Sequence, residues 1–125
     1  MLLNISTEQK IESATRVALS GSLDSDTAPD LGRELDPILN RQPKALIFDM
    51  ADLDFISSAG LRVVLKTKKS VERYGGELAM VHLKPQVAKV FEIVEALPSM
   101  SIFANVEEMD EYLQVIQSRT AGKEG

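Results

Sequence analysis

The segment ALIFDMADLDFISSAGLRVVL, residues 45–65, contains the strongest signals for the fold of this chain. It opens with a short apolar run, residues 45–48, which ends at Asp49. A run without polar alternation is typical of a strand that is buried on both faces of a sheet. From Leu61 onward, apolar residues recur at helical spacing. The segment therefore predicts a buried strand followed by a helix.

Two small polar residues, Ser57 and Ser58, lie where this helix should begin. A serine hydroxyl at such a position can accept a hydrogen bond from the unpaired backbone N–H groups of the first turn. The same N–H groups and the helix dipole also favour a negatively charged group. Each serine is therefore either a helix cap or a site where a charge can be added, and the residues alone leave both roles open.

The composition limits the classes of function. A chain of 125 residues predicts one domain with a single core. The sequence has no cysteine and one histidine, His82, which excludes disulfides and centres built from several histidines. A net charge of −5 argues against general nucleic-acid binding and favours a protein or small-molecule partner. Without an apolar run of about 18 residues or a signal-peptide pattern, we expect a cytoplasmic protein without membrane insertion, metal or cofactor.

Strands and helices alternate around the central segment. Strands are predicted at residues 2–6, 14–19, 45–48, 77–83 and 101–103, and the first two should form a hairpin. The first helix carries Leu31, Leu35, Ile38 and Leu39, with Asp26 or Thr27 as its N-cap and Pro29 in its first turn. Further helices are predicted at residues 58–74 and 85–95, and a last one, capped by Asn105, carries Met109, Tyr112, Leu113 and Ile116. This order predicts a mixed sheet with helices packed on it.

Candidate catalytic groups are few. Asp49, Asp52 and Asp54 are interpreted as solvated acids in a loop after the strand. A phospho-aspartate receiver would also need two acids after the first strand and a lysine after the last, and residues 2–7 and 101–105 contain neither. A catalytic serine would need a histidine base, and His82 is placed at a strand end without evident partners. We therefore expect that the protein is not an enzyme.

Three short motifs carry a resemblance to a known family. They are GSLD at residues 21–24 followed by Thr27 and Ala28, LIFD at 46–49 followed by LDFI at 53–56, and SSAGL at 57–61. In this order the chain resembles the STAS domains, and within them the bacterial anti-sigma-factor antagonists, from Leu3 to about Ile116. The resemblance implies one STAS-type α/β domain over residues 1–119, with a mixed sheet of about five strands and about four helices, mostly on one face. The polar composition of residues 120–125 predicts a flexible C-terminal tail.

The resemblance also implies a switch between partners. Unphosphorylated antagonists of the family bind an anti-sigma factor that is a serine kinase, the kinase phosphorylates a serine at the start of the helix, and the complex dissociates. A serine phosphatase reverses the modification. The family motif commonly reads DSSGL, and alignment on Gly60 and Leu61 places Ser58 at the modified serine and Ser57 at the aspartate. Ser58 is the expected acceptor and Ser57 the second choice, and the hydroxyl should be exposed for the kinase.

The expected partner-binding residues lie in two segments: Asp24, Ser25 and Thr27, and then Ser57, Ser58, Ala59, Gly60, Leu61 and Arg62. Asp24 could contact the partner or stabilise its own turn, and Thr27 is more easily explained as a cap. Arg62 could reach a partner acid or the phosphate, or be an ordinary exposed helix arginine. Three alternatives remain: an adaptor or scaffold subunit of a transporter or signalling assembly that is never phosphorylated, a sensor of a nucleotide or lipid, and a weak homodimer.

Overall fold

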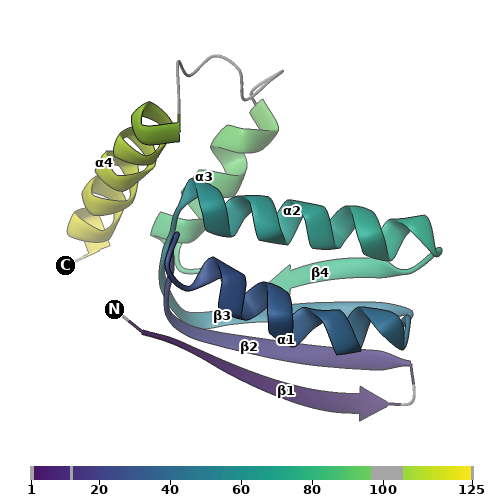
Figure 1. Cartoon of the computed structure of the whole chain (residues 1–125). Helices are drawn as coiled ribbons and strands as arrows, with labels where there is room; N and C mark the ends of the chain where they lie inside the picture. The colour runs from purple at the N-terminus through teal and green to yellow at the C-terminus, as the bar shows by residue number, and fades with distance from the viewer. Residues whose placement is uncertain (1, 12, 97–105, 125) are drawn as a thin grey trace.

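The computed structural model describes residues 2–11, 13–96 and 106–124 (Figure 1). The elements are β1 (Leu3–Ile11), β2 (Ala14–Leu23), α1 (Ala28–Asn40), β3 (Ala45–Ile56), α2 (Ser58–Arg73), β4 (Glu77–Val81), α3 (Pro85–Ala96) and α4 (Val106–Glu124). The predicted hairpin, the buried central strand and the alternation that follows are confirmed. The predicted strand at residues 101–103 and the predicted cap Asn105 lie outside the described residues.

In the described part of the chain the sheet has four strands in the order β1-β2-β3-β4. β1 and β2 pair antiparallel, whereas β2 with β3 and β3 with β4 pair parallel. The sheet is therefore mixed, as predicted. Antiparallel neighbours can be joined by a tight turn, but parallel neighbours need a crossover, which α1 and α2 provide.

One face of the sheet forms the core. The alternate residues of β2 and β3 that point to this face are fully buried, and α1 and α2 lie side by side across it (Figure 1). The core side chains include Val17, Leu19, Leu46, Phe48 and Met50 from the strands and Leu31, Leu35, Leu61 and Val64 from the helices. The helices thus bury their apolar stripes against the strands, and the start of α2 is held at the end of the sheet where β3 ends.

The central strand is longer than predicted, because β3 pairs with β2 from Ala45 to Ile56. Asp49, Asp52 and Asp54 therefore lie within β3, and their interpretation as loop acids is wrong. Asp52 and Asp54 are exposed, but Asp49 is buried. Continued pairing along β2 supplies the backbone hydrogen bonds that keep this polar segment in a strand.

The last helix, α4, is confirmed with two differences. Met109 and Leu113 are buried as predicted, whereas Tyr112 is 42% exposed. α4 also continues to Glu124, so the expected domain boundary at residue 119 falls inside a helix. Flexibility of the last residues stays a prediction. α4 packs beside α3, near the end of β3 and the start of α2 (Figure 1). No helix in the described ranges is long and apolar enough to cross a membrane.

Candidate functional site

Ser57 is the N-cap of α2. Its backbone is extended, with φ −98° and ψ 176°, and its Oγ accepts a hydrogen bond from the Gly60 N–H at 3.2 Å. The Ser57 N–H donates to the Leu23 carbonyl at the end of β2, at 2.9 Å. The side chain thus satisfies one of the unpaired N–H groups of the first helical turn. Ser57 performs the capping role that the sequence left open between the two serines.

Ser58 is the first residue of α2 and has a different environment. Its backbone N–H donates to the Asp110 carboxylate at 2.9 Å. Its hydroxyl is buried and has no hydrogen-bond partner within the part of the chain that the structure describes. The residue is only 5% exposed, so the expectation of an exposed hydroxyl is wrong for this conformation. The reason is α4, whose Met109 and Asp110 lie over the start of α2.

Two residues of α4 connect it to residues 56–58, which we call the serine segment. The sequence prediction missed both. Besides Asp110, the Gln117 side chain accepts from the Ile56 N–H at 2.9 Å and donates to the Ile56 carbonyl at 2.8 Å. Gln117 follows Met109 and Leu113 at intervals of four residues, on the buried face of the helix. A glutamine on an apolar helical face was a usable signal. Asp110 lies among other acids and gave none.

Gly60 allows the close approach of α2 to β2. A Cβ atom built on Gly60 would lie 2.5 Å from the Leu23 Cγ and 2.8 Å from the Leu23 carbonyl oxygen. Neither distance is compatible with a normal contact, so only glycine fits without a shift of β2 or α2. The close approach brings the Leu23 carbonyl within reach of the Ser57 N–H. The small residues of the SSAGL motif therefore have a packing role in addition to any role in binding.

A groove of about 430 Å³ runs along α2 beside α4. Its lining combines Ser58 with apolar side chains and three cationic side chains: Ser58, Leu61, Arg62, Leu65, Lys66, Lys69 and Met109. The cations Arg62, Lys66 and Lys69 are exposed and recur at helical spacing. The predicted contact residue Arg62 therefore lies on an open basic edge of the site.

The Asp24 segment lies next to this site but is largely self-contained. The Asp24 carboxylate accepts from the backbone N–H groups of Asp26 and Thr27 at 2.9 and 3.1 Å. Thr27 holds the N-cap position of α1, but its hydroxyl bonds backward, to the Ser22 carbonyl and the Asp24 N–H, at 2.8 and 2.9 Å. Asp24 therefore stabilises its own turn. Ser25 is exposed beside it.

The predicted partner-binding residues thus differ in access. Ser25 and Arg62 are exposed, Asp24 and Ala59 are half-buried, and Thr27, Ser57, Ser58, Gly60 and Leu61 are buried. A second groove, of about 470 Å³, lies between the Asp24 segment, the end of β3 and α4, because it is lined by Ser22, Asp24, Phe55, Gln114, Gln117 and Ser118. α4 therefore borders the Asp24 segment across this groove and contacts the start of α2 through Asp110.

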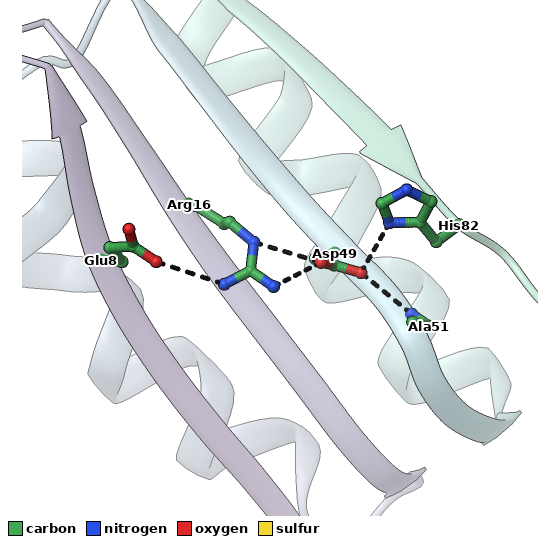
Figure 2. A network of polar contacts seen from close by, with 5 residues as sticks. All are labelled: Glu8, Arg16, Asp49, Ala51 and His82. Carbon is green, nitrogen blue, oxygen red and sulfur yellow. Dashed lines mark hydrogen bonds and ion pairs between the residues drawn. The ribbon is translucent and has the colours of Figure 1, made fainter.

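A separate polar cluster surrounds Asp49 within β3 (Figure 2). Asp49 accepts from both Arg16 Nε, at 3.1 Å, and Arg16 Nη2, from the Ala51 N–H at 3.1 Å, and lies 3.2 Å from His82 Nδ1. Arg16 also approaches Glu8, at 3.5 Å. We name these five residues the Asp49 cluster. His82 therefore has a partner, contrary to the prediction, and its partner is Asp49 and neither serine.

The Asp49 cluster changes the acidity of its carboxyl group. The hydrogen bonds from Arg16 lower the pKa of Asp49 from 3.8 to about 2. Burial acts in the opposite direction, and the bonds from Ala51 and His82 add to the lowering. The carboxylate is thus charged and paired at any physiological pH, as a structural ion pair would be. No group of acidic or histidine side chains in the described ranges is arranged to hold a metal ion.

Comparison with known proteins decides the family. The sequence profile of the STAS domain matches residues 6–109, which is most of the chain. The chain belongs to the STAS domain family. The family assignment, the α/β fold and the resemblance to anti-sigma-factor antagonists that the three motifs implied are confirmed by this match and by the relatives that follow.

Two curated relatives of this STAS domain are named for a regulatory role. BtrV of Bordetella bronchiseptica, named as a candidate anti-sigma factor antagonist, is 40% identical over 87 residues, which cover 70% of this chain and 75% of BtrV. The anti-sigma-B factor antagonist of Bacillus subtilis is 30% identical over 107 residues, covering 86% of this chain and 96% of the relative. Both names describe binding regulators, in agreement with the prediction that the protein is not an enzyme.

Solved structures share the STAS fold. The anti-sigma factor antagonist SpoIIAA in its unphosphorylated form superposes with a TM-score of 0.63 at 20% identity, covering 72% of this chain and 83% of SpoIIAA. SpoIIAA from Bacillus in its phosphorylated form superposes with a TM-score of 0.61 at 19% identity, covering 73% and 83%. At these identities the likeness concerns the fold.

Proposed function

We propose that this STAS domain is a cytoplasmic anti-sigma-factor antagonist that is switched by phosphorylation of Ser58. In the unphosphorylated form it binds an anti-sigma factor with serine kinase activity and so frees a sigma factor. Phosphorylation of Ser58 releases the anti-sigma factor, and a serine phosphatase restores binding. The names of the two curated relatives support the antagonist role, and SpoIIAA, which has the same fold, exists in both phosphorylation states.

The difference between the two serine hydroxyls is the observation that carries the choice of residue. Ser57 Oγ is engaged in capping α2, since it accepts from the Gly60 N–H. Ser58 Oγ makes no hydrogen bond within the described residues, although it is buried. Ser22 Oγ, in β2, is buried and without a partner among the described residues as well, so this property separates Ser58 from Ser57 and is not unique to Ser58. The position of Ser58 at the start of α2, where an added anion is favoured, then selects its hydroxyl for modification.

A phosphate on Ser58 would have opposite effects on the domain and on its partner. It adds a charge of about −1.5 to −2 near neutral pH, at a helix N-terminus that favours anions. A docked anti-sigma factor would have to bury this hydrated group against its own surface. A cost of about 3 kcal/mol for an unpaired charge in the interface would weaken binding more than a hundredfold.

Phosphorylation of the purified protein by its kinase tests the assignment. The anti-sigma factor that co-purifies from the native host is incubated with ATP and with the wild type, Ser57→Ala or Ser58→Ala, and the phosphorylated residue is mapped by mass spectrometry. We expect one phosphate, on Ser58, in the wild type and in Ser57→Ala, and none in Ser58→Ala. Phosphate on Ser57 would move the switch to the neighbouring residue, and absence of phosphate from all three proteins would reject it.

The burial of Ser58 favours a second candidate function, that of an adaptor that is never phosphorylated. With 5% exposure, the side chain is not accessible to a kinase while α4 is in place. An adaptor would bind its partner equally well as wild type and as Ser58→Asp. The switch predicts loss of binding for Ser58→Asp, with Asp52→Asn, an exposed change in β3, as the control that keeps binding.

A further inference from the structure

We infer that α4 is an intramolecular inhibitor of the switch, because it covers Ser58 and places the Asp110 carboxylate where the phosphate of a modified Ser58 would need to bind. The inference rests on the proposed function, since it assigns a regulator to the same hydroxyl. It makes α4 docking and Ser58 phosphorylation mutually exclusive. The residues that hold the inhibited state are Asp110 and Gln117.

α4 packs mainly against α3, and side-chain hydrogen bonds from Asp110 and Gln117 link it to the serine segment. Among the side chains of α4 that the structure describes, only Met109, Leu113 and Gln117 are buried. The polar links run from Gln117 to both backbone groups of Ile56 and from Asp110 to the Ser58 N–H. They bracket Ser57 in the chain. Besides its packing on α3, α4 is therefore tied by Asp110 and Gln117 to the residues on either side of the N-cap.

Asp110 occupies the anion site of α2. An anion at a helix N-terminus is stabilised by the backbone N–H groups and the dipole, and the Asp110 carboxylate takes this place by accepting from the Ser58 N–H at 2.9 Å. A phosphate on Ser58 would compete for the same N–H groups. It would also bring like charge next to the Asp110 carboxylate. Phosphorylation is therefore expected to displace α4.

The state of the Ser58 hydroxyl supports this reading independently of charge. The buried Ser58 hydroxyl, which has no hydrogen-bond partner among the residues the structure describes, would regain water as a partner if α4 moved away. Hydration of the Ser58 hydroxyl would therefore offset part of the free energy that is needed to move α4 away. By thermodynamic linkage, if phosphate displaces α4, then displacement of α4 must favour phosphorylation by the same factor. A contact that weakens α4 docking, such as a partner bound to α4, would thus activate the site.

Because the sequence has no cysteine, a single introduced thiol can measure how accessible position 58 is to solvent. In Ser58→Cys the only thiol lies under α4, and its reaction with the thiol reagent DTNB reports how often α4 opens. Lys68→Cys, on the exposed side of α2 outside the groove, supplies the reference rate. We expect the Ser58→Cys thiol to react at least about tenfold more slowly than the reference. Equal rates would overturn the inference.

Second substitutions in the Ser58→Cys background identify the residues that hold α4. Asp110→Ala and Gln117→Ala should each raise the labelling rate about tenfold, as expected for a lost hydrogen bond in this position. Glu111→Ala and Gln114→Ala, exposed residues of α4 of matching type, should leave it unchanged. Equal acceleration by all four would contradict specific roles for Asp110 and Gln117. Circular dichroism confirms that each variant is folded.

Phosphoserine installed at position 58 during translation tests the mutual exclusion. Hydrogen exchange of the α4 backbone should be faster than in the unmodified protein, while exchange in β2 and β3 stays unchanged. Unchanged exchange in α4 would overturn the inference. These measurements need no kinase, so a protected, releasable Ser58 that no kinase modifies would reject the proposed function and leave the cover by α4 standing. If the thiol at position 58 is freely accessible and Ser58 of the wild type is phosphorylated, the cover by α4 is rejected and the proposed function stands.

Discussion

The Asp49 cluster and the Ser57–Ser58 pair lie along the same strand and its continuation, and their hydrogen bonding differs. Asp49 accepts bonds on both carboxylate oxygens, from Arg16, Ala51 and His82 (Figure 2). In the serine pair one hydroxyl caps α2 and the other has no partner within the described residues. Saturated polar groups stabilise a fold, whereas a buried group without a partner costs stability. The contrast separates a carboxylate whose hydrogen bonds stabilise the fold from the Ser58 hydroxyl, which gains no such bond within the described residues.

The largest expected effect tests the packing on which the serine pair depends. Gly60→Ala would place a Cβ atom 2.5 Å from Leu23, and should destabilise the fold by about 3 kcal/mol in urea unfolding. Gly32→Ala is the matched control, since a Cβ there meets no atom within 4 Å. Because Gly32 is inside α1, its replacement should be neutral or stabilise by up to about 1 kcal/mol. Equal effects of the two substitutions would show that close packing does not define the start of α2.

The next-largest effect tests the Asp49 cluster, in which both carboxylate oxygens accept hydrogen bonds. Asp49→Asn removes the charged acceptor of Arg16 and should lower the free energy of unfolding by about 2 kcal/mol. Asp52→Asn, an exposed residue of the same strand, should change it by less than about 0.5 kcal/mol. Chemical denaturation at pH 7 compares the two. A neutral Asp49→Asn would mean that the cluster contributes no stability.

The pH dependence of stability follows from the same carboxyl group. Its pKa is about 2 in the folded protein and near 3.8 in an unfolded chain, so the unfolded state binds the proton more readily. The stabilising contribution is therefore complete above about pH 4 and is lost as the pH falls toward 2, by about 2 kcal/mol in total. Asp49→Asn should remove this part of the acid dependence. Identical acid profiles for wild type and variant would contradict the lowered pKa.

The smallest stability effects separate the two serines. Ser57→Ala removes a helix cap and should cost about 1 kcal/mol. Ser58→Ala removes a buried hydroxyl that has no partner in the described part of the chain, and it should be neutral or stabilise by up to about 1 kcal/mol. Thermal unfolding of both variants measures the difference. The reverse order would assign the cap to Ser58 and the free hydroxyl to Ser57.

The sequence predicted the framework because its signals were local. The apolar run at residues 45–48, the spacing of Leu31, Leu35 and Ile38 and the SSAGL segment were each sufficient to place an element, and the motif order identified the family. The length of β3 was missed because pairing with β2, a non-local interaction, overrides the polar character of residues 49–54.

The site was predicted less completely than the fold. The serines were found at the start of α2, but their unequal roles depend on contacts with Leu23 and with α4, which are distant in the sequence. The burial of Ser58 could not be anticipated, because Asp110 carries no pattern that distinguishes it from its acidic neighbours. Gln117 was detectable as a polar residue on the buried face of a helix.

Binding of the anti-sigma factor with and without a phosphate on Ser58 tests the central claim most directly. The anti-sigma factor isolated from the native host is titrated by calorimetry with the unmodified protein and with the protein carrying phosphoserine at position 58. We predict stoichiometric binding by the unmodified form and affinity that is at least about a hundredfold weaker for the phosphorylated form. Equal affinity of the two forms would contradict a phosphorylation switch at Ser58.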